Sequence, residues 1–243
     1  MNRNANIFHR LAAALLALAL LTGCALAESA GDTTLPPMQE SFAELYAQNP
    51  HIAGWLEMDP DIALPVVQWD NSFYMDHDFE GNEDVGGTLF VDSRNSLDPQ
   101  DDHILIYGHN MKDGSMFGSL NNYRNVGFLR ATACIQFNSI YGDAQYVPFA
   151  IFDASMTKDD PDYFRLLRFN FSDETPIEAF LEEARSRSLF DIPVEVNADD
   201  QLLSLVTCSY SMDDGRFIIL CRKLRADETP EQMSALLQQS RTK

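Results

Sequence analysis

Three residues whose side chains could together perform acyl transfer stand at the edges of apolar runs. Cys208 ends one run, His109 ends another, and Arg216 directly precedes a third. Because each run is typical of a strand, neighbouring strands could bring the thiol, the imidazole and the guanidinium to one rim of a sheet. A thiolate attacks a carbonyl, a histidine exchanges protons with amines, and an arginine holds an oxyanion. The trio therefore predicts acyl transfer through a thioester.

The order of these residues excludes several classes of cysteine enzyme. Papain-like proteases place the cysteine first, whereas here His109 precedes Cys208, and the caspase signature Q-A-C-x-G is absent. The S/T-H-G-x-C stretch that L,D-transpeptidases usually carry does not precede Cys208. The 5 histidines show no paired ligand spacing with one another or with cysteine, so we expect no metal and no cofactor.

The charge of the chain bears on its partners. The chain has 243 residues and a formal net charge of −20. Nucleic-acid binding needs a basic surface, so we expect no nucleic-acid partner. The charge also disfavours electrostatic docking on anionic lipid. It indicates either a solvated acidic surface or attraction of a cationic substrate or amine nucleophile.

Residues 1–27 are typical of an export signal. Two basic residues precede an apolar stretch, Leu11–Leu21, that is too short to span a bilayer comfortably. The following Leu-Thr-Gly-Cys resembles a bacterial lipobox, in which Cys24 would be lipidated and become the first mature residue. Cleavage after Ala27 at an A-x-A site and an uncleaved anchor are the alternatives. All three place the folded domain outside the cytoplasm, and a lipid or an anchor would attach it to the outer face of the cell membrane.

The remaining chain divides into three parts. Residues 28–37 are polar and contain prolines, and we expect a tether there. Residues 38–226 are enough for one domain with a sizeable core. Residues 227–243 form a C-terminal tail, for which the pattern favours a helix over Glu228–Ser240 with little to pack on.

Short apolar runs predict a domain that is mainly β. About eight such runs favour a closed or nearly closed barrel. The expected strands are Ile52–Glu57, Leu64–Trp69, Gly87–Asp92, His103–His109, Thr132–Asn138, Gln145–Ser155, Leu202–Cys208 and Phe217–Leu224. The expected helices are Met38–Gln48, Asp162–Phe169 and Thr175–Ser188.

Two further cysteines lie inside predicted strands. Cys134 and Cys221 are each flanked by apolar residues, which is typical of small buried side chains. A disulfide between them is the alternative in an oxidising compartment, but the sequence does not show that they are neighbours.

Several motifs, in order along the chain, resemble those of the sortases and of class B sortases in particular. The most specific is IYGHNMKDGSMF over Ile106–Phe117, which is similar to the class B histidine region almost letter for letter. Leu205–Tyr210 and Asp214–Ile218 resemble the strands that carry the family's thiol and arginine. The likeness extends from about Phe42 to Leu224.

This resemblance implies an eight-stranded sortase-type β-barrel, with an N-terminal helix and a helix before the cysteine strand. It also implies a cysteine transpeptidase. By this likeness Cys208 is the nucleophile that attacks the Thr carbonyl of a sorting signal. His109 is the general acid and base, and Arg216 stabilises the substrate carbonyl and its oxyanion.

The resemblance also suggests residues that bind the signal. Asn71 and Met75 match positions that line the signal groove in class B enzymes, and core packing is the alternative role for Met75. Thr207 beside the nucleophile is added to them, with a purely structural role in its strand as the alternative. Two departures from the family pattern bear on the signal sequence. Val206 stands where some members have a serine, and Ser209-Tyr210 replaces an acidic pair, so no third acid is expected to orient the histidine.

The implied partners are exported proteins that carry a C-terminal sorting signal. The amine acceptor would belong to a peptidoglycan precursor or to a pilin-like protein, and a lipid or N-terminal anchor would hold the enzyme at the membrane. Two other functions remain open: an exported thiol hydrolase on the same fold, and a non-catalytic surface lipoprotein that binds peptides.

Overall fold

The computed structural model describes residues 37–58, 60–171, 176–209, 211 and 214–243. The predicted export signal with Cys24 and the predicted tether up to residue 36 lie outside these residues. Pro37–Lys243 form one compact unit. No helix within the described part of the chain combines the length and the apolar character that crossing a bilayer requires.

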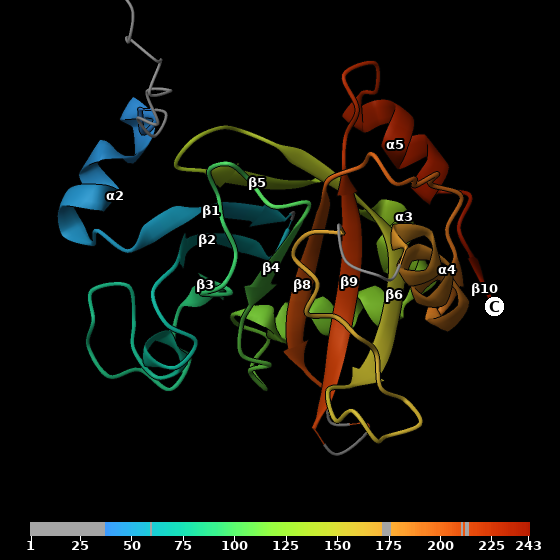
Figure 1. Ribbon diagram of the computed structural model, residues 1–243, viewed down its shortest axis with the longest axis horizontal. Coiled ribbons are helices and arrows are strands. Elements are labelled where there is room, and N and C mark those ends of the chain that lie inside the picture. Colours follow the sequence, from blue (N-terminus) through green and yellow to red (C-terminus); the bar gives the residue numbers. More distant parts are fainter. Residues whose placement is uncertain (1–36, 59, 172–175, 210, 212–213) are drawn as a thin grey trace, which may run out of the picture. The chain divides into compact units, whose positions relative to one another are not determined.

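A closed barrel of eight strands forms the centre of the domain (Figure 1), which confirms the predicted architecture. Around the barrel the order is β1–β2–β3–β4–β8–β9–β6–β5. Neighbours pair antiparallel except for β2 with β3 and β4 with β8, which are parallel. The strands are β1 Ile52–Met58, β2 Ile62–Val67, β3 Leu89–Val91, β4 His103–Tyr107, β5 Ile135–Ser139, β6 Gln145–Ser155, β8 Leu202–Cys208 and β9 Gly215–Lys223.

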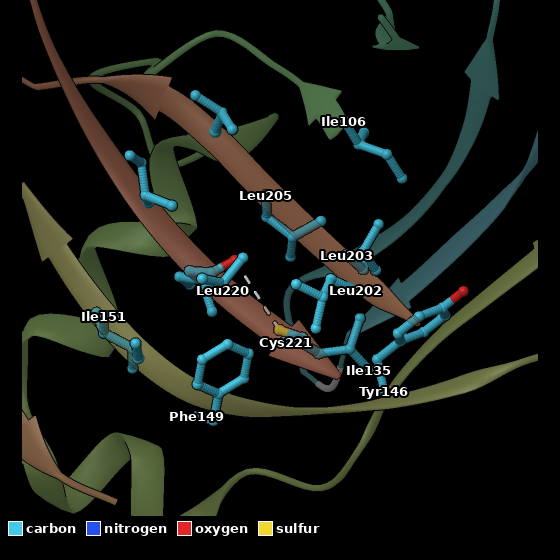
Figure 2. Close-up of a cluster of buried hydrophobic side chains, with 14 of the residues drawn as sticks. Ile106, Ile135, Tyr146, Phe149, Ile151, Leu202, Leu203, Leu205, Leu220 and Cys221 are labelled. Carbon is cyan, nitrogen blue, oxygen red and sulfur yellow. Dashed lines mark hydrogen bonds between the residues drawn. The ribbon is translucent and has the colours of Figure 1, made fainter. Parts of the chain in front are cut away.

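The apolar runs of β8 and β9 explain why these strands lie in the middle of the core. Every residue of β8 from Leu202 to Thr207 is buried, so both faces of the strand are covered. Figure 2 shows part of this core, where Leu205 of β8, Leu220 of β9 and Ile151 of β6 gather. Burial of each such side chain contributes about 1.5–3 kcal/mol. Only Cys208, the last residue of β8, is exposed.

Most of the expected helices are present. The 3₁₀ turn η1 (Glu40–Phe42) leads into α2 (Ala43–Gln48), within the range predicted for the N-terminal helix. Helix α4 (Ile177–Arg187) packs on β6 and buries its apolar face, as expected. Helix α5 (Pro230–Leu237) begins with a capping box between Thr229 and Gln232.

The expectation that the C-terminal helix has little to pack on is wrong. Met233 and Leu237 of α5 are buried, and the helix packs against α3 (Val126–Ala131). The guanidinium of Arg130 on α3 also donates through Nε to the Ser240 carbonyl at 2.8 Å. The end of the chain is therefore part of the folded unit.

The helix predicted over Asp162–Phe169 is wrong, because this segment is extended. Its side chains alternate: Phe164, Leu166 and Arg168 are buried, whereas Leu167 is 38% exposed. That period of two is the pattern of an extended chain on a surface, not of a helix. The segment lies along the start of β4, where the Phe169 carbonyl accepts from the His103 amide at 2.9 Å.

Several short elements were not predicted, among them the 3₁₀ turn η2 (Phe73–Met75). The 3₁₀ helix η3 (Phe117–Arg124) is followed by α3, whose first turn is capped by the Asn125 side chain. Since α3 continues to Ala131, β5 begins three residues later than the strand predicted from Thr132. Strands β7 (Phe190–Asp191) and β10 (Arg241–Thr242) form a separate two-stranded sheet.

Candidate active site

A groove of about 280 Å³ opens at the end of the barrel where β8 ends and β9 begins. All six residues that the sequence suggested for catalysis or signal binding line this groove, although they come from distant parts of the chain. They are Asn71, Met75, His109, Thr207, Cys208 and Arg216.

Cys208 and Arg216 face one another across neighbouring strands. Their Cα atoms are register partners in the antiparallel pair β8–β9. Directly opposed residues of such a pair project to the same face of the sheet, so the thiol and the guanidinium share one side of the rim. Within the described chain, Arg216 donates only to the carbonyls of Asp214 and Gly215, at 3.3 and 3.0 Å. Its charge is not neutralised by any described carboxylate.

His109 lies just beyond β4, because the strand ends at Tyr107, two residues earlier than predicted. The parallel register pairs Tyr107 with Val206, and continuing it places His109 beside Cys208. The His109 Nε2 lies 2.5 Å from the Met75 carbonyl oxygen. A carbonyl can only accept, so this nitrogen carries a proton in that contact. The ring is thereby oriented by a residue of the groove wall.

Gly108 fixes the backbone that carries the histidine. Its amide donates to the Val206 carbonyl at 3.2 Å, and its carbonyl accepts from the Thr207 hydroxyl at 2.8 Å. A Cβ at this position would lie 2.4 Å from a side-chain carbon of Leu89 and 2.8 Å from ring carbons of Phe117, so a larger residue would require these side chains to shift. Thr207 is therefore placed to hold the histidine loop against β8, as well as to line the groove.

Asn110 connects the histidine loop to the nucleophile. Its Nδ2 donates to the carbonyl oxygen of Cys208 at 2.7 Å, and its Oδ1 accepts from Asn121 at 2.8 Å. Asn110 also forms an isolated bridge with Met116. This residue thus orients the loop and takes part in its turn.

Asp92 is a groove residue that the sequence did not single out. It directly follows β3, and its carboxylate is almost fully buried. The carboxylate accepts from Tyr107 Oη at 3.1 Å, from Asn71 Nδ2 at 3.3 Å and from two nitrogens of Arg94. Burial alone would raise the pKa of Asp92, but the hydrogen bonds from Arg94 and Asn71 outweigh it and hold that pKa below its usual value. The one sequence feature that could have indicated a role for Asp92 is its position as a polar residue directly after an apolar run.

The other groove walls are apolar. Tyr74, Phe90, Met156 and Val206 line it together with Leu167. Leu167 is exposed here because residues 164–169 are extended rather than helical. Met75 is likewise 47% exposed. An open groove with apolar walls and a few fixed polar groups suits an extended peptide.

An acidic residue of β6, Asp153, hydrogen-bonds the residue that follows Cys208. The Asp153 carboxylate on β6 accepts from the Ser209 hydroxyl at 2.6 Å and from both terminal nitrogens of Arg124. No carboxylate among the described residues hydrogen-bonds the His109 ring.

Cys134 and Cys221 are free thiols, so the alternative of a disulfide between them is not realised. Burial raises the pKa of Cys134 to about 11 and that of Cys221 well above its usual value. Both sulfurs therefore stay protonated at neutral pH, and thiols in that state are poor nucleophiles. Cys208 differs from them in being exposed.

Comparison with known proteins identifies the family. No family model matches the chain. Sortase B of Listeria monocytogenes is 31% identical over 186 residues, which cover 75% of this chain and 73% of that protein. Sortase B of Staphylococcus aureus is 28% identical over 192 residues, which cover 77% and 76%.

The fold gives the same result. The structure of a Staphylococcus aureus sortase B–substrate complex matches with a TM-score of 0.70 and 27% identity, over 78% of this chain and 87% of that one. An identity above 30% over most of both chains, together with the shared barrel, shows common membership. The chain therefore belongs to the class B sortases, and it is a cysteine transpeptidase of that family.

Proposed function

We propose that this enzyme cleaves a sorting signal after Thr through a thioester on Cys208 and transfers the acyl group to an amine. The pairing of Cys208 with Arg216 at the end of the groove, beside the His109 loop, is the observation that supports this function most strongly. As a class B sortase, the protein acts on substrates that carry sorting signals, and sortases act at the cell surface.

The proposed reaction has two halves. The Cys208 thiolate attacks the Thr carbonyl, and the oxyanion forms near the Arg216 guanidinium. His109 gives a proton to the departing amine as the C–N bond breaks, which leaves a thioester. An incoming amine then attacks the thioester, His109 takes its proton, and the Cys208 thiolate departs as the new amide forms. Arg216 suits this role because no carboxylate among the described residues pairs with its guanidinium.

The finer assignments are part of the same proposal. Asn71, Met75 and Thr207 would contact the signal in the groove. The acceptor amine would belong to a peptidoglycan precursor or a pilin-like protein. Lipidation of Cys24 would hold the enzyme on the outer face of the membrane, and replacement of Cys24 by Ala should then release the domain into the medium.

Intact-protein mass spectrometry tests the proposed reaction. The chain without residues 1–27 is incubated with pooled Asn-Pro-x-Thr-x and Leu-Pro-x-Thr-x peptides, with and without a small amine. We expect an acyl adduct that the amine releases as a new amide. Release by water at the same rate with or without amine would instead identify a thiol hydrolase.

The matched control is Cys208→Ala. Because the thiol lies exposed at the end of β8, its loss should abolish adduct and turnover while the circular dichroism spectrum is unchanged. Turnover by this variant would overturn the assignment of the nucleophile. Absence of an adduct on the unmodified enzyme with every peptide would favour a scaffold that binds peptides without chemistry.

A further inference from the structure

A second arginine faces the groove, and its guanidinium is fixed before any ligand arrives. Arg94 Nε donates to Asp92 Oδ1 at 2.9 Å, and Arg94 Nη2 donates to Asp92 Oδ2 at 2.8 Å. The Phe169 ring lies beneath the guanidinium, with 5.1 Å from the Arg94 Cζ to the ring centre. Such a bidentate pair over an aromatic ring holds the plane of the guanidinium in one orientation.

Asp92 is in turn held from several directions. Its carboxylate accepts from the Tyr107 hydroxyl, the Asn71 amide group and the backbone amide of Arg94. Asn71 is itself fixed, because its Oδ1 accepts from the Ser93 amide at 2.7 Å. The Asp92 carboxylate therefore cannot swing away, and it positions Arg94 as a rigid support.

The remaining edge of Arg94 is available. The side chain is 52% exposed although the Asp92 side chain is only 1% exposed. Among the described residues, none accepts a hydrogen bond from Arg94 Nη1. Arg94 and Arg216 line the same groove, so its described lining carries two guanidiniums and one carboxylate, that of Asp92. Donors that need no reorganisation before binding give affinity and selectivity at small entropic cost.

We propose that Arg94, positioned by Asp92, is a specificity-determining residue that binds a side-chain carbonyl or carboxylate oxygen of the sorting signal. This inference rests on the proposed function and adds to it the chemistry of the preferred signal. A signal with Gln or Glu facing Arg94 gains a charge-assisted hydrogen bond. A signal with Lys there is repelled by both arginines. Arg94 touches no reacting bond, so it acts on binding and not on the acyl transfer itself.

Peptide discrimination tests the inference. A panel places Gln, Glu, Ala or Lys in turn at each variable position of the signal, and KM and the maximal rate of thioester formation are measured separately. At one position we expect Gln or Glu to bind about tenfold better than Ala, with Lys weaker still. Arg94→Ala should lose that preference, and the loss should be seen in KM.

Because Arg94→Ala leaves the Asp92 carboxylate without its main partner, Arg94→Lys is the second variant. Lysine keeps a positive charge beside Asp92 but removes the planar fork, so most of the preference should still be lost. Arg225→Lys is the matched control. Its pair with Asp200 has the same geometry, 2.9 and 2.8 Å, but lies outside the groove. It should leave the preference intact.

Two outcomes separate this inference from the proposed function. If the enzyme forms thioesters but Arg94→Ala and Arg94→Lys keep the full preference, the inference is overturned and the transpeptidase remains. If no peptide forms a thioester, the proposed function fails. Fluorescence anisotropy of the same peptides on the Cys208→Ala protein then decides the inference, since it reports binding without chemistry. Equal affinity of Gln, Glu, Ala and Lys peptides would overturn it there as well.

Discussion

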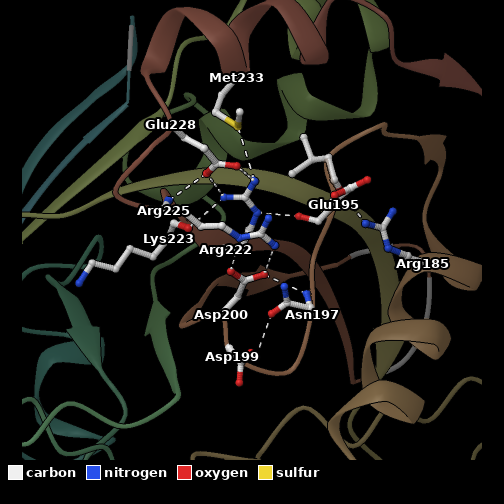
Figure 3. A network of polar contacts seen from close by, with 11 residues as sticks. Arg185, Glu195, Asn197, Asp199, Asp200, Arg222, Lys223, Arg225, Glu228 and Met233 are labelled. Atoms are coloured by element: carbon white, nitrogen blue, oxygen red, sulfur yellow. Dashed lines mark hydrogen bonds and ion pairs between the residues drawn. The ribbon is translucent and has the colours of Figure 1, made fainter.

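The two ends of strand β9 carry arginines with opposite surroundings. Arg222 is 1% exposed, and each of its nitrogens has a partner, as Figure 3 shows. Its Nη1 and Nη2 donate to the two Glu228 oxygens at 2.5 and 2.6 Å, and its Nε donates to the Glu195 carbonyl at 2.7 Å. Among the residues that the structure describes, Arg216 at the other end donates only to the backbone carbonyls of its two preceding residues. One arginine is saturated by the fold, and the other keeps donors for a ligand.

The histidines of β4 show the same division. His103, the first residue of the strand, is completely buried, and its Nδ1 and Nε2 are 2.8 Å from the Arg168 carbonyl and the Ser204 hydroxyl. His109, just past the other end, is partly exposed and contacts a groove residue. Residue type alone therefore does not distinguish structural from functional groups; the saturation of their donors does. Arg222 and His103 thus stabilise one end of the barrel, whereas Arg216 at the other end has no side-chain partner among the described residues.

Arg216→Lys is expected to have the largest effect. A lysine keeps the charge but cannot present two parallel donors to a carbonyl, so kcat/KM for peptide cleavage should fall about a hundredfold to a thousandfold. Urea unfolding should shift by less than about 0.5 kcal/mol, because the guanidinium has no buried partner. Near-normal turnover in this variant would make Arg216 a structural residue like Arg222 and remove the contrast.

Arg222→Ala should instead lower stability and leave activity nearly unchanged. Removal of the guanidinium leaves Glu228 and the Glu195 carbonyl without their donor, which should reduce the free energy of unfolding by about 3 kcal/mol. Urea titration measures this loss. Thioester formation per folded molecule, measured at low temperature, should change little because the site lies at the other end of β9. If Arg222→Ala were as stable as the unmodified protein but formed the thioester more slowly, the assignment of a structural role to this end of β9 would be contradicted.

Much of this arrangement could be predicted from the sequence, because strands that are buried on both faces leave long apolar runs in it. The bounds of β6 and β8 agree with the prediction because their long apolar runs are covered on both faces. The strand-end positions of Cys208 and Arg216 followed from those runs. His109 lies near them although its strand ends two residues earlier than predicted, because the hydrogen bonds of Gly108 with Val206 and Thr207 keep the chain beside β8.

The features that could not be predicted from the sequence depend on contacts between distant segments. Phe164 and Leu167 have the spacing of a helix face, and only the contact with β4 shows that the chain is extended there. Asp92 and Arg94 look like a surface ion pair in the sequence. Their place in the groove is set by the fold, which brings Tyr107 of β4 and the loop of Asn71 to the same carboxylate.

A pH titration of stability should sharpen the comparison of the histidines. Burial of His103 lowers its pKa to about 4, against about 6.5 in the unfolded chain. As pH falls, His103 therefore becomes protonated in the unfolded state before it does so in the folded state. The free energy of unfolding keeps its full value above about pH 6.5 and decreases as pH falls toward 4. At pH 4.5 this linkage should cost about 2 kcal/mol relative to pH 7.

His103→Gln provides the comparison for that titration. Glutamine stays neutral, so the difference in unfolding free energy between pH 7 and pH 4.5 should be about 2 kcal/mol smaller than in the unmodified protein. If the unfolding free energies of both proteins changed equally with pH, burial would not lower the pKa of His103.

The smallest effect is expected for Arg225→Ala, which removes an ion pair that shares the geometry of Arg94–Asp92 without its groove. Arg225 is 32% exposed, so its pair with Asp200 should contribute no more than about 1 kcal/mol at pH 7. Burial alone would raise the pKa of Asp200, but the hydrogen bonds from Arg225 lower it below its usual value. The contribution is therefore present above about pH 4 and disappears as pH falls through the lowered pKa of the folded state.

A double-mutant cycle of Arg225→Ala with Asp200→Asn, measured by urea unfolding at pH 7 and pH 2.5, isolates this pair. The coupling should be detectable at pH 7 and weaker at pH 2.5, because protonation of the Asp200 carboxylate removes the ion pair as the pH falls through its lowered pKa. A coupling of several kcal/mol would mean that this end of the barrel depends on its exposed pairs as much as on Arg222. Any change in peptide preference in Arg225→Ala would mean that the two ends are coupled, because no residue of this pair reaches the groove.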